Sequence, residues 1–127
     1  MKPGVFTQMC IHLVFAVKYR ERLLKNEIRP HVFRYISGII SNRGHKSIII
    51  NGVSDHVHIL LGLNPNDRIS DLVGTIKKSS STFINDKSWF KNSFHWQDGY
   101  GSFSYSKSQF DHIYKYIYNQ EKHHKKR

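Results

Sequence analysis

The chain has 127 residues, 39% of them hydrophobic, which suffices for one compact domain but not for two independent cores. Its 20 Lys and Arg residues against 9 Asp and Glu residues give a formal net charge of +11, the balance of a protein that binds a polyanion. No apolar stretch approaches the roughly 20 residues of a membrane helix and the N-terminus lacks the pattern of a signal peptide, so we predict a cytoplasmic protein with no membrane partner.

The first half of the chain has the spacing of a strand, a helix and two further strands. Apolar residues recur at every second position over residues 6–17, which predicts a long strand followed by a basic turn. Helical spacing then begins at Ile28 and continues to Gly44, a helix stop signal. Residues 45–53 and 56–63 are predicted to be strands, and the short gap between them indicates a hairpin.

The second half predicts a helix, a strand and a final helix. Residues 69–86 have helical spacing, with Ser70 or Asp67 as the expected N-cap. Residues 94–106 alternate aromatic with small or polar residues, which favours a fourth strand, and an amphipathic helix is expected over about 107–127. The order β-α-β-β-α-β-α predicts an α+β fold in one domain over residues 1–127. Its antiparallel sheet would have the split β-α-β pattern of ferredoxin-like domains, plus an extra C-terminal helix.

Two histidines on a predicted strand are the strongest local signal for chemistry. His56 and His58 are two residues apart, so both imidazoles point to the same face of the sheet and could reach one metal ion. The alternative is a histidine pair that only lines a half-buried face. The nine acidic residues are scattered, which disfavours a carboxylate-based metal site, and the single Cys10 excludes a cysteine zinc cluster.

The final helix carries a second candidate pair. Tyr116 and Gln120 are four residues apart and therefore share one side of the helix, and we expect both to lie off its apolar stripe. A tyrosine can act as a covalent nucleophile, and a glutamine carbonyl oxygen can be a neutral metal ligand. In the alternative interpretation, Tyr116 packs or stacks together with Tyr114 and Tyr118.

These motifs, in this order, resemble the single-tyrosine HUH transposases of the IS200/IS605 family. Residues 12–20 look like the first strand and basic turn of that family, and residues 96–103 are similar to its fourth-strand signature. Residues 116–120, with the histidines that follow them, resemble its catalytic helix. The resemblance covers nearly the whole chain and implies the same fold, with the tyrosine on the C-terminal helix.

The resemblance also implies a function and a set of site residues. Tyr116 would be the nucleophile, and His56, His58 and Gln120 would hold Mg²⁺ or Mn²⁺. Such enzymes cut and rejoin single-stranded DNA at transposon-end hairpins through a 5′-phosphotyrosine intermediate, without ATP. They act as homodimers in which the tyrosine helix can complete the partner's site. The alternatives are a domesticated or inactive protein that only binds hairpin DNA, and an HUH nuclease that processes genomic repeats.

Basic residues are the expected contacts to the DNA backbone, although each could equally belong to a solvated surface. No phosphate-binding loop of the nucleotide-binding type occurs, so no nucleotide cofactor is expected. His12 and His95 are expected to be structural or to line the sheet. The candidate DNA contacts lie in the basic turn, on the outward face of the 69–86 helix and near the C-terminus: Lys18, Arg20, Arg22, Lys77, Lys78, Lys122 and Lys125.

Overall fold

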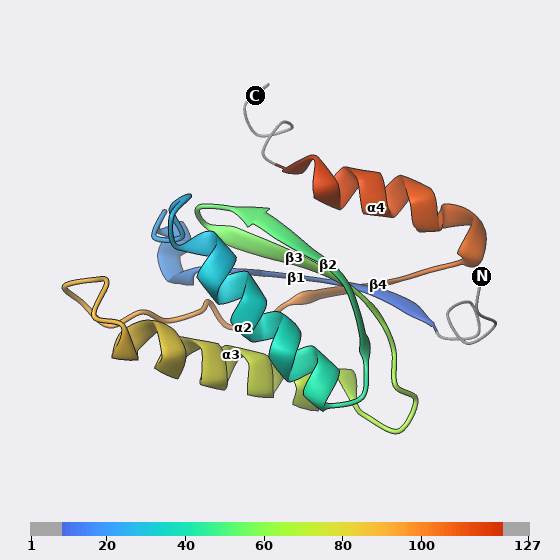
Figure 1. Ribbon diagram of the computed structural model, residues 1–127, viewed down its shortest axis with the longest axis horizontal. Coiled ribbons are helices and arrows are strands. Elements are labelled where there is room, and N and C mark those ends of the chain that lie inside the picture. The colour runs from blue at the N-terminus through green and yellow to red at the C-terminus, as the bar shows by residue number, and fades with distance from the viewer. Residues whose placement is uncertain (1–8, 121–127) are drawn as a thin grey trace.

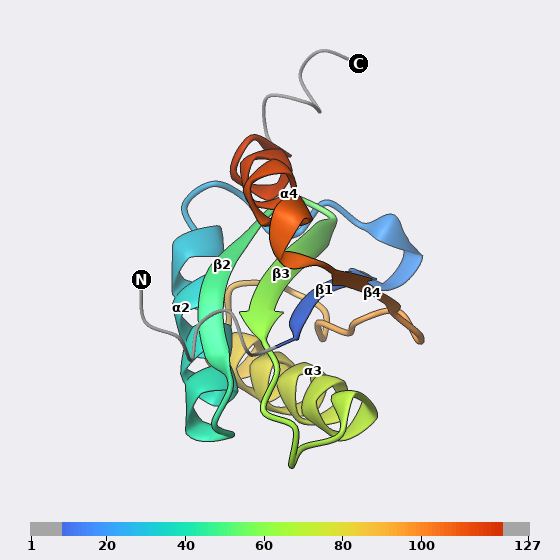
Figure 2. The ribbon, with the colours of Figure 1, turned by 90° about the vertical axis from the view of Figure 1, so that its right-hand side faces the viewer.

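The computed structural model describes residues 9–120, which form a four-stranded antiparallel sheet with helices on both faces (Figure 1). Helices α2 and α3 cover one face, and α4 lies over the other (Figures 1 and 2). The strand order β2-β3-β1-β4 confirms the predicted ferredoxin-like arrangement with an extra helix. The elements are β1 (Cys10–Ala16), η1 (Lys18–Arg20), α2 (Arg29–Asn42), β2 (Lys46–Val53), β3 (His56–Gly62), α3 (Ile69–Asp86), β4 (Gly101–Tyr105), η2 (Lys107–Gln109) and α4 (Phe110–Tyr118).

Side chains of the central strand β3 alternate between a main core and a smaller core on opposite faces of the sheet. Val57, Ile59 and Leu61 of β3 are buried in the main core with α2 and α3. The intervening Leu60 instead packs in the smaller core under α4. Because side chains two apart share a face, His56 and His58 lie on the α4 face with Leu60. The fold therefore presents the histidine pair to the C-terminal helix.

Helix α4 is anchored to the sheet by apolar packing and by one polar contact. Its Ile113 and Ile117 are buried against Leu60 of β3. The side-chain amide of Asn51, on β2, donates hydrogen bonds to the carbonyl oxygens of Ile117 and Tyr118, at 2.9 and 3.1 Å. Carbonyls at the end of a helix have no partner within the helix, so Asn51 supplies what the short α4 lacks. These contacts fix α4 over the face that carries the histidines.

The fourth strand is shorter than predicted. Only Gly101–Tyr105 pairs with β1, and before it only Trp96 forms an isolated bridge, to Val17. Phe94 and Trp96 are buried in the main core instead of lining a ladder, and the Trp96 indole donates to Ser80 Oγ at 2.9 Å. Over residues 94–100, the alternating aromatic pattern therefore reflects packing in the core and not a strand of the sheet.

The hairpin between β2 and β3 requires a glycine. A Cβ atom on Gly52 would lie 2.3 Å from the backbone oxygen of His56, so the two strands can approach this closely only with no side chain there. The turn is also tied to the neighbouring chain, because the carbonyl of Asp55 accepts a hydrogen bond from the backbone of Val17 at 2.9 Å. This packing fixes the start of β3, where His56 stands.

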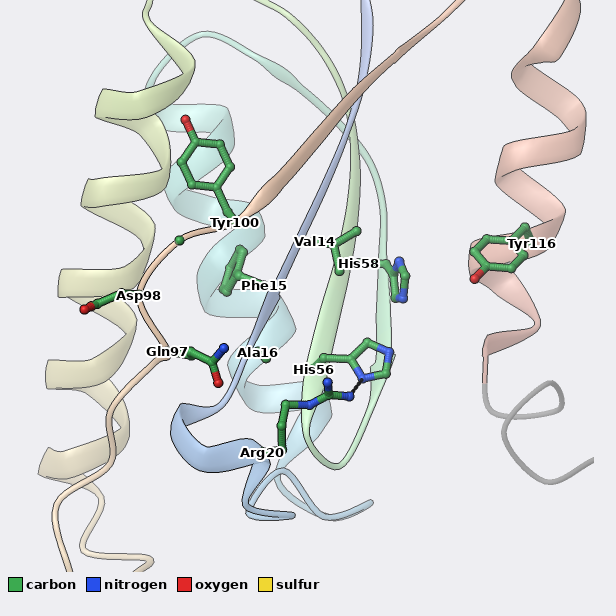
Figure 3. Close-up of a pocket in the computed structure, with 11 residues that line it drawn as sticks. Val14, Phe15, Ala16, Arg20, His56, His58, Gln97, Asp98, Tyr100 and Tyr116 are labelled. Carbon is green, nitrogen blue, oxygen red and sulfur yellow. Dashed lines mark hydrogen bonds between the residues drawn. The ribbon is translucent and has the colours of Figure 1, made fainter. Parts of the chain in front are cut away.

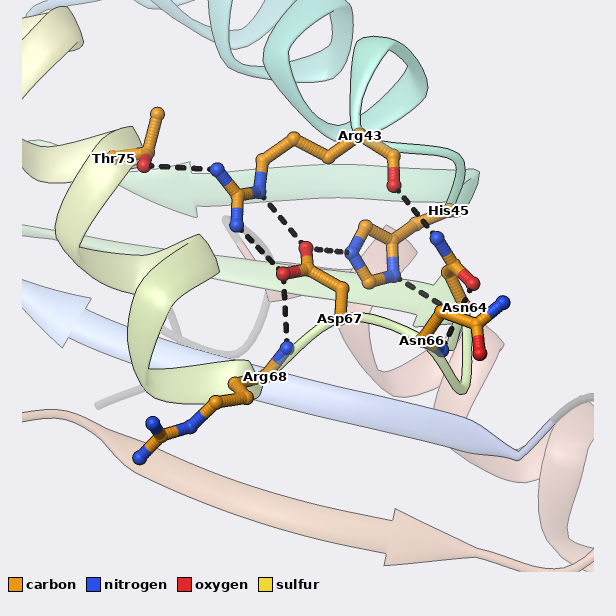
Figure 4. Close-up of polar contacts among 7 residues, drawn as sticks. All are labelled: Arg43, His45, Asn64, Asn66, Asp67, Arg68 and Thr75. Atoms are coloured by element: carbon orange, nitrogen blue, oxygen red, sulfur yellow. Dashed lines mark hydrogen bonds and ion pairs between the residues drawn. The ribbon is translucent and has the colours of Figure 1, made fainter.

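The prediction that Ser70 or Asp67 is the N-cap of α3 is wrong. Arg68 occupies the cap position without a side-chain cap, and Asp67 faces a polar cluster instead (Figure 4). Its carboxylate accepts two hydrogen bonds from Arg43, at 2.6 and 2.8 Å, and one from His45 at 2.7 Å. The backbone N–H of Asn64 donates to His45 Nδ1 at 2.9 Å, which fixes the imidazole proton on Nε2, toward Asp67. The cluster therefore joins the end of α2, the start of β2 and the loop before α3.

We expect the exchange Asp67→Asn to lower the melting temperature by about 5 °C, because it weakens several charge-assisted hydrogen bonds at once. The hydrogen bonds from Arg43 and His45, together with the Arg43 charge, hold the pKa of the Asp67 carboxyl well below its ordinary value, although burial opposes this. A lowered folded-state pKa contributes stability that is present above the unfolded-state pKa of about 4 and is lost as the pH falls below it.

Thermal unfolding of both proteins between pH 7 and pH 2 checks this prediction. The difference in melting temperature should be full at pH 6 and should shrink below pH 4. A difference that is absent at pH 6, or that grows in acid, would contradict the role given to Asp67.

Among residues 9–120, no helix is long and apolar enough to cross a membrane.

Candidate active site

His56 and His58 stand side by side at the start of β3 and line one pocket (Figure 3). Their ring centroids are 5.0 Å apart and the ring planes are 70° from parallel. His58 is buried, with 6% of its surface exposed, while His56 is partly open to solvent. The shared face that strand spacing predicts for the two imidazoles is therefore present.

A carboxylate and an arginine hold the ring of His56. Its Nδ1 lies 2.8 Å from Asp55 Oδ1, and Arg20 forms an ion pair with Asp55 at 3.2 Å. Burial tends to raise the pKa of Asp55, but the hydrogen bond from His56 and the charge of Arg20 outweigh it and lower that pKa. The ionised carboxylate can only accept hydrogen bonds, and it is much closer to His56 Nδ1 than the Arg20 guanidinium, which lies 3.5 Å away, so the His56 proton is on Nδ1. His56 would therefore coordinate a ligand through its other nitrogen, Nε2.

A second histidine holds the ring of His58. His12, on the neighbouring strand β1, places its Nε2 2.8 Å from His58 Nδ1, and the two rings stack with centroids 5.1 Å apart. Burial lowers the pKa of His12 to about 4, so this ring is neutral at neutral pH. The prediction that His12 is structural or lines the sheet gave no reason to place it against a candidate metal ligand.

Tyr116 faces the histidine pair from α4 (Figure 3). Its ring centroid is 5.9 Å from that of His58, the ring planes are nearly perpendicular at 85°, and 42% of the residue is exposed. Tyr116 lines the same pocket as His56 and His58. The structure thus brings the candidate nucleophile and two candidate ligands of one chain together, across the gap between the sheet and α4.

Gln120 does not join them. Its side chain is buried, with 3% exposed, its Nε2 donates to the backbone oxygen of Tyr116 at 3.5 Å, and it is not among the residues that line the pocket. The expectation that Gln120 lies off the apolar stripe is wrong. It follows Ile113 by seven residues and Ile117 by three, and this spacing returns to the same helix face. Within residues 9–120, no group of three or more His, Cys, Asp or Glu side chains is placed to hold a metal.

The opposite wall of the pocket is a loop that a lysine holds in place. Lys77 of α3 donates to the carbonyl oxygens of Gln97 and Gly99, at 2.8 and 2.6 Å. Burial lowers the pKa of this ammonium group, although the charge of Asp98 opposes the shift. Lys77 does not point outward as expected, because its ammonium group secures the chain that leads into β4. The pocket is lined by Val14, Phe15, Ala16, Arg20, His56, His58, Gln97, Asp98, Gly99, Tyr100 and Tyr116.

The other candidate DNA contacts lie at different places on the surface. Lys18 and Arg20 flank Tyr19, an exposed aromatic residue whose ring lies 5.4 Å from the Lys18 ammonium. Arg20 lines the pocket, whereas Lys18 does not. Arg22 and Lys78 are exposed and lie outside the pocket. Lys122 and Lys125 lie outside the described residues.

Comparison with solved structures identifies the class of protein that has this fold. The chain superposes on the crystal structure of a proposed transposase from Deinococcus radiodurans R1 with a TM-score of 0.70 and 25% identity, over 94% of this chain and 96% of that one. A REP-associated tyrosine transposase, solved with a bound REP hairpin, gives a TM-score of 0.72 at 18% identity, over 92% of this chain and 68% of that one. The fold is therefore that of a transposase.

Sequence comparison narrows the class to a family. Residues 5–120 match the family described as "Transposase IS200 like", and the chain belongs to it. ISDra2 transposase TnpA of Deinococcus radiodurans is 29% identical over 124 residues, which cover 92% of this chain and 87% of that protein. The transposase for insertion sequence element IS200 of Salmonella typhimurium is 28% identical over 94 residues, or 70% of this chain and 62% of the relative. The resemblance found in the motifs is thus confirmed.

Proposed function

We propose that this transposase cuts and rejoins single-stranded DNA with Tyr116 as its nucleophile and with a divalent cation, Mg²⁺ or Mn²⁺, at His56 and His58. The observation that carries the proposal is the shared pocket, in which the Tyr116 ring lies 5.9 Å from that of His58, beside His56. A protein that only binds DNA has no need to keep a tyrosine against two oriented imidazoles. The net charge of +11 supports a polyanionic substrate.

The chemistry assigned to Tyr116 is a transesterification at phosphorus. The phenolate oxygen forms a bond to the phosphorus, and the bond from that phosphorus to the 3′ oxygen breaks. The 3′ oxygen keeps the electron pair and takes up a proton as a free 3′-OH, while the phenol proton passes to solvent. One phosphodiester replaces another, so attack by a DNA 3′-OH can reverse the step and rejoin a strand without ATP.

The donor set of the pocket fits a divalent cation. His56 is held by Asp55 and His58 by His12, so both rings are oriented before any ligand binds. A divalent cation there would polarise a phosphate oxygen, and two neutral imidazoles would leave its charge undiminished. The third ligand proposed from the resemblance, Gln120, would have to leave its buried position to reach the pocket.

Among residues 9–120, Arg20 is the basic residue that lines the pocket. Its guanidinium lines the pocket while paired with Asp55, at the point where a phosphate would approach His56. Tyr19, beside it, is 79% exposed and offers a face on which an unpaired base can stack. Arg20 and Tyr19 thus support a single-stranded DNA substrate. Hairpins in that DNA are proposed because the structural relative was solved with a REP hairpin. The proposed assembly is a homodimer, with the tyrosine acting within its own chain or on its partner, as the family resemblance implies.

A covalent-adduct assay tests the proposal. We expect a protein–DNA band that survives a denaturing gel when the protein meets labelled single strands from both flanks of its gene with Mg²⁺ or Mn²⁺. Fully paired duplexes of the same sequence and a chelator-treated sample should give none. Tight hairpin binding without an adduct, on either flank and with either metal, would instead favour the protein that only binds DNA.

A further inference from the structure

His12 is buried in the middle of the sheet, beside the candidate metal ligand His58. It pairs with Leu60 on one side and Phe103 on the other, so His58, two residues before Leu60, is its diagonal neighbour across the strands. Only 4% of His12 is exposed. Its Nε2 lies 2.8 Å from His58 Nδ1, and the two ring planes are within 22° of parallel.

The protonation of the two rings determines which nitrogen donates and which accepts in this hydrogen bond. One of the two nitrogens must carry a proton and the other must accept it, because both rings are neutral when His58 binds a cation. A histidine that coordinates through Nε2 carries its proton on Nδ1. His58 Nδ1 would then donate to His12 Nε2, and the His12 proton would be on Nδ1.

The surroundings of His12 agree with that direction. Its Nδ1 is buried and, among residues 9–120, has no hydrogen-bond partner. The rings of Phe103 and Tyr105 lie close to His12, with centroids at 5.7 and 6.1 Å. Among aromatic rings an N–H group can still make a weak contact to a π face, which a lone pair cannot.

The Asp55–His56 contact has the same form, with a different acceptor. Both rings of the pocket engage a neighbour through Nδ1, at 2.8 Å in each case. Asp55 is charged and lies at the hairpin turn, whereas His12 is neutral and lies inside the sheet. A carboxylate at the position of His12 would be buried without a cation beside it, which is costly. A neutral acceptor is the form that this position allows.

We propose that His12 is a positioning residue that fixes the tautomer and orientation of His58, so that His58 Nε2 faces the metal pocket before the cation arrives. This rests on the metal site proposed above. Losing such an outer partner commonly weakens metal binding by about 10- to 100-fold. His12 would therefore contribute to metal affinity although its own Nε2 faces a histidine rather than the cation.

Metal binding by two variants tests the role of His12. The exchange His12→Leu keeps the bulk and removes the acceptor, whereas the side-chain oxygen of His12→Gln can reach the same place. With Mn²⁺ titrations followed by electron paramagnetic resonance, we expect His12→Leu to raise the Kd about 10- to 100-fold and His12→Gln to restore most of the affinity. The exposed His95, which does not line the pocket, provides the matched control, His95→Leu, with unchanged affinity.

The proton itself can be observed in the wild-type protein, which avoids any question of folding. Long-range ¹H–¹⁵N correlation spectra of the metal-free protein should show the proton of His58 on Nδ1 and that of His12 also on Nδ1. A proton on Nε2 of His58 would overturn the proposal, as would a His12→Leu variant that binds Mn²⁺ like the wild type. Failure of the wild type to bind Mn²⁺ would instead refute the proposed metal site, while the spectrum would still report the tautomer.

Discussion

The Tyr116→Phe protein is expected to form no covalent DNA adduct, a loss of about 10³-fold or more in the rate of strand cleavage. The exchange removes only the hydroxyl oxygen that would bond to phosphorus. The ring, which lies against His58 at a centroid distance of 5.9 Å, is kept, so the packing of α4 should not change. Denaturing gels with labelled single-stranded DNA measure the cleavage, and retardation in native gels should show that DNA binding persists.

The same helix offers two matched controls. Tyr114 and Tyr118 stack on each other with ring centroids 6.5 Å apart, and neither lines the pocket of His56 and His58. Tyr114→Phe and Tyr118→Phe should therefore form the adduct at close to the wild-type rate. An adduct that persists in Tyr116→Phe and disappears in either control would move the nucleophile to that residue and break the link between Tyr116 and the histidine pair.

Local patterns predicted much of the fold. The helix predicted over residues 69–86 has the bounds of α3, because its apolar spacing and the turn before it lie within one stretch of chain. The strand over 56–63 is nearly that of β3, and alternation along it correctly placed His56 and His58 on one face. The predicted strand over 94–106 failed because Phe94 and Trp96 pack under the sheet and only the part from Gly101 pairs.

The candidate site was harder to predict because its supporting contacts are distant in sequence. His12 is 46 residues from His58, and Asn51 is 66 residues from Ile117, whose carbonyl it binds. Strand register decides the first contact and helix docking decides the second, and neither leaves a local pattern. The contact between Asp55 and His56 was easier to predict, because the two residues are adjacent in the sequence. For Gln120, the helical spacing from Ile113 already indicated a buried position.

Removing the imidazoles of both His56 and His58 is expected to reduce adduct formation strongly, second only to Tyr116→Phe. We expect the double exchange His56→Ala and His58→Ala to reduce adduct formation about 10²-fold or more, because a polarising cation typically contributes several kcal/mol to such a reaction. The single exchange His56→Ala should lose less than the double exchange. It should recover part of its activity at high Mn²⁺ concentration, since one oriented imidazole remains. Adduct yield measured against Mn²⁺ concentration separates weaker metal binding from lost chemistry.

The controls for this experiment come from the histidines outside the pocket. His95→Ala should show the wild-type yield and the wild-type dependence on Mn²⁺, because His95 is exposed and does not line the pocket. Hairpin binding by the double variant should remain near normal, because Arg20 and the other basic residues are unchanged. If the double variant still formed adducts at the wild-type rate, the cation would not be held by His56 and His58. Tyr116 would then have to act on phosphate without them.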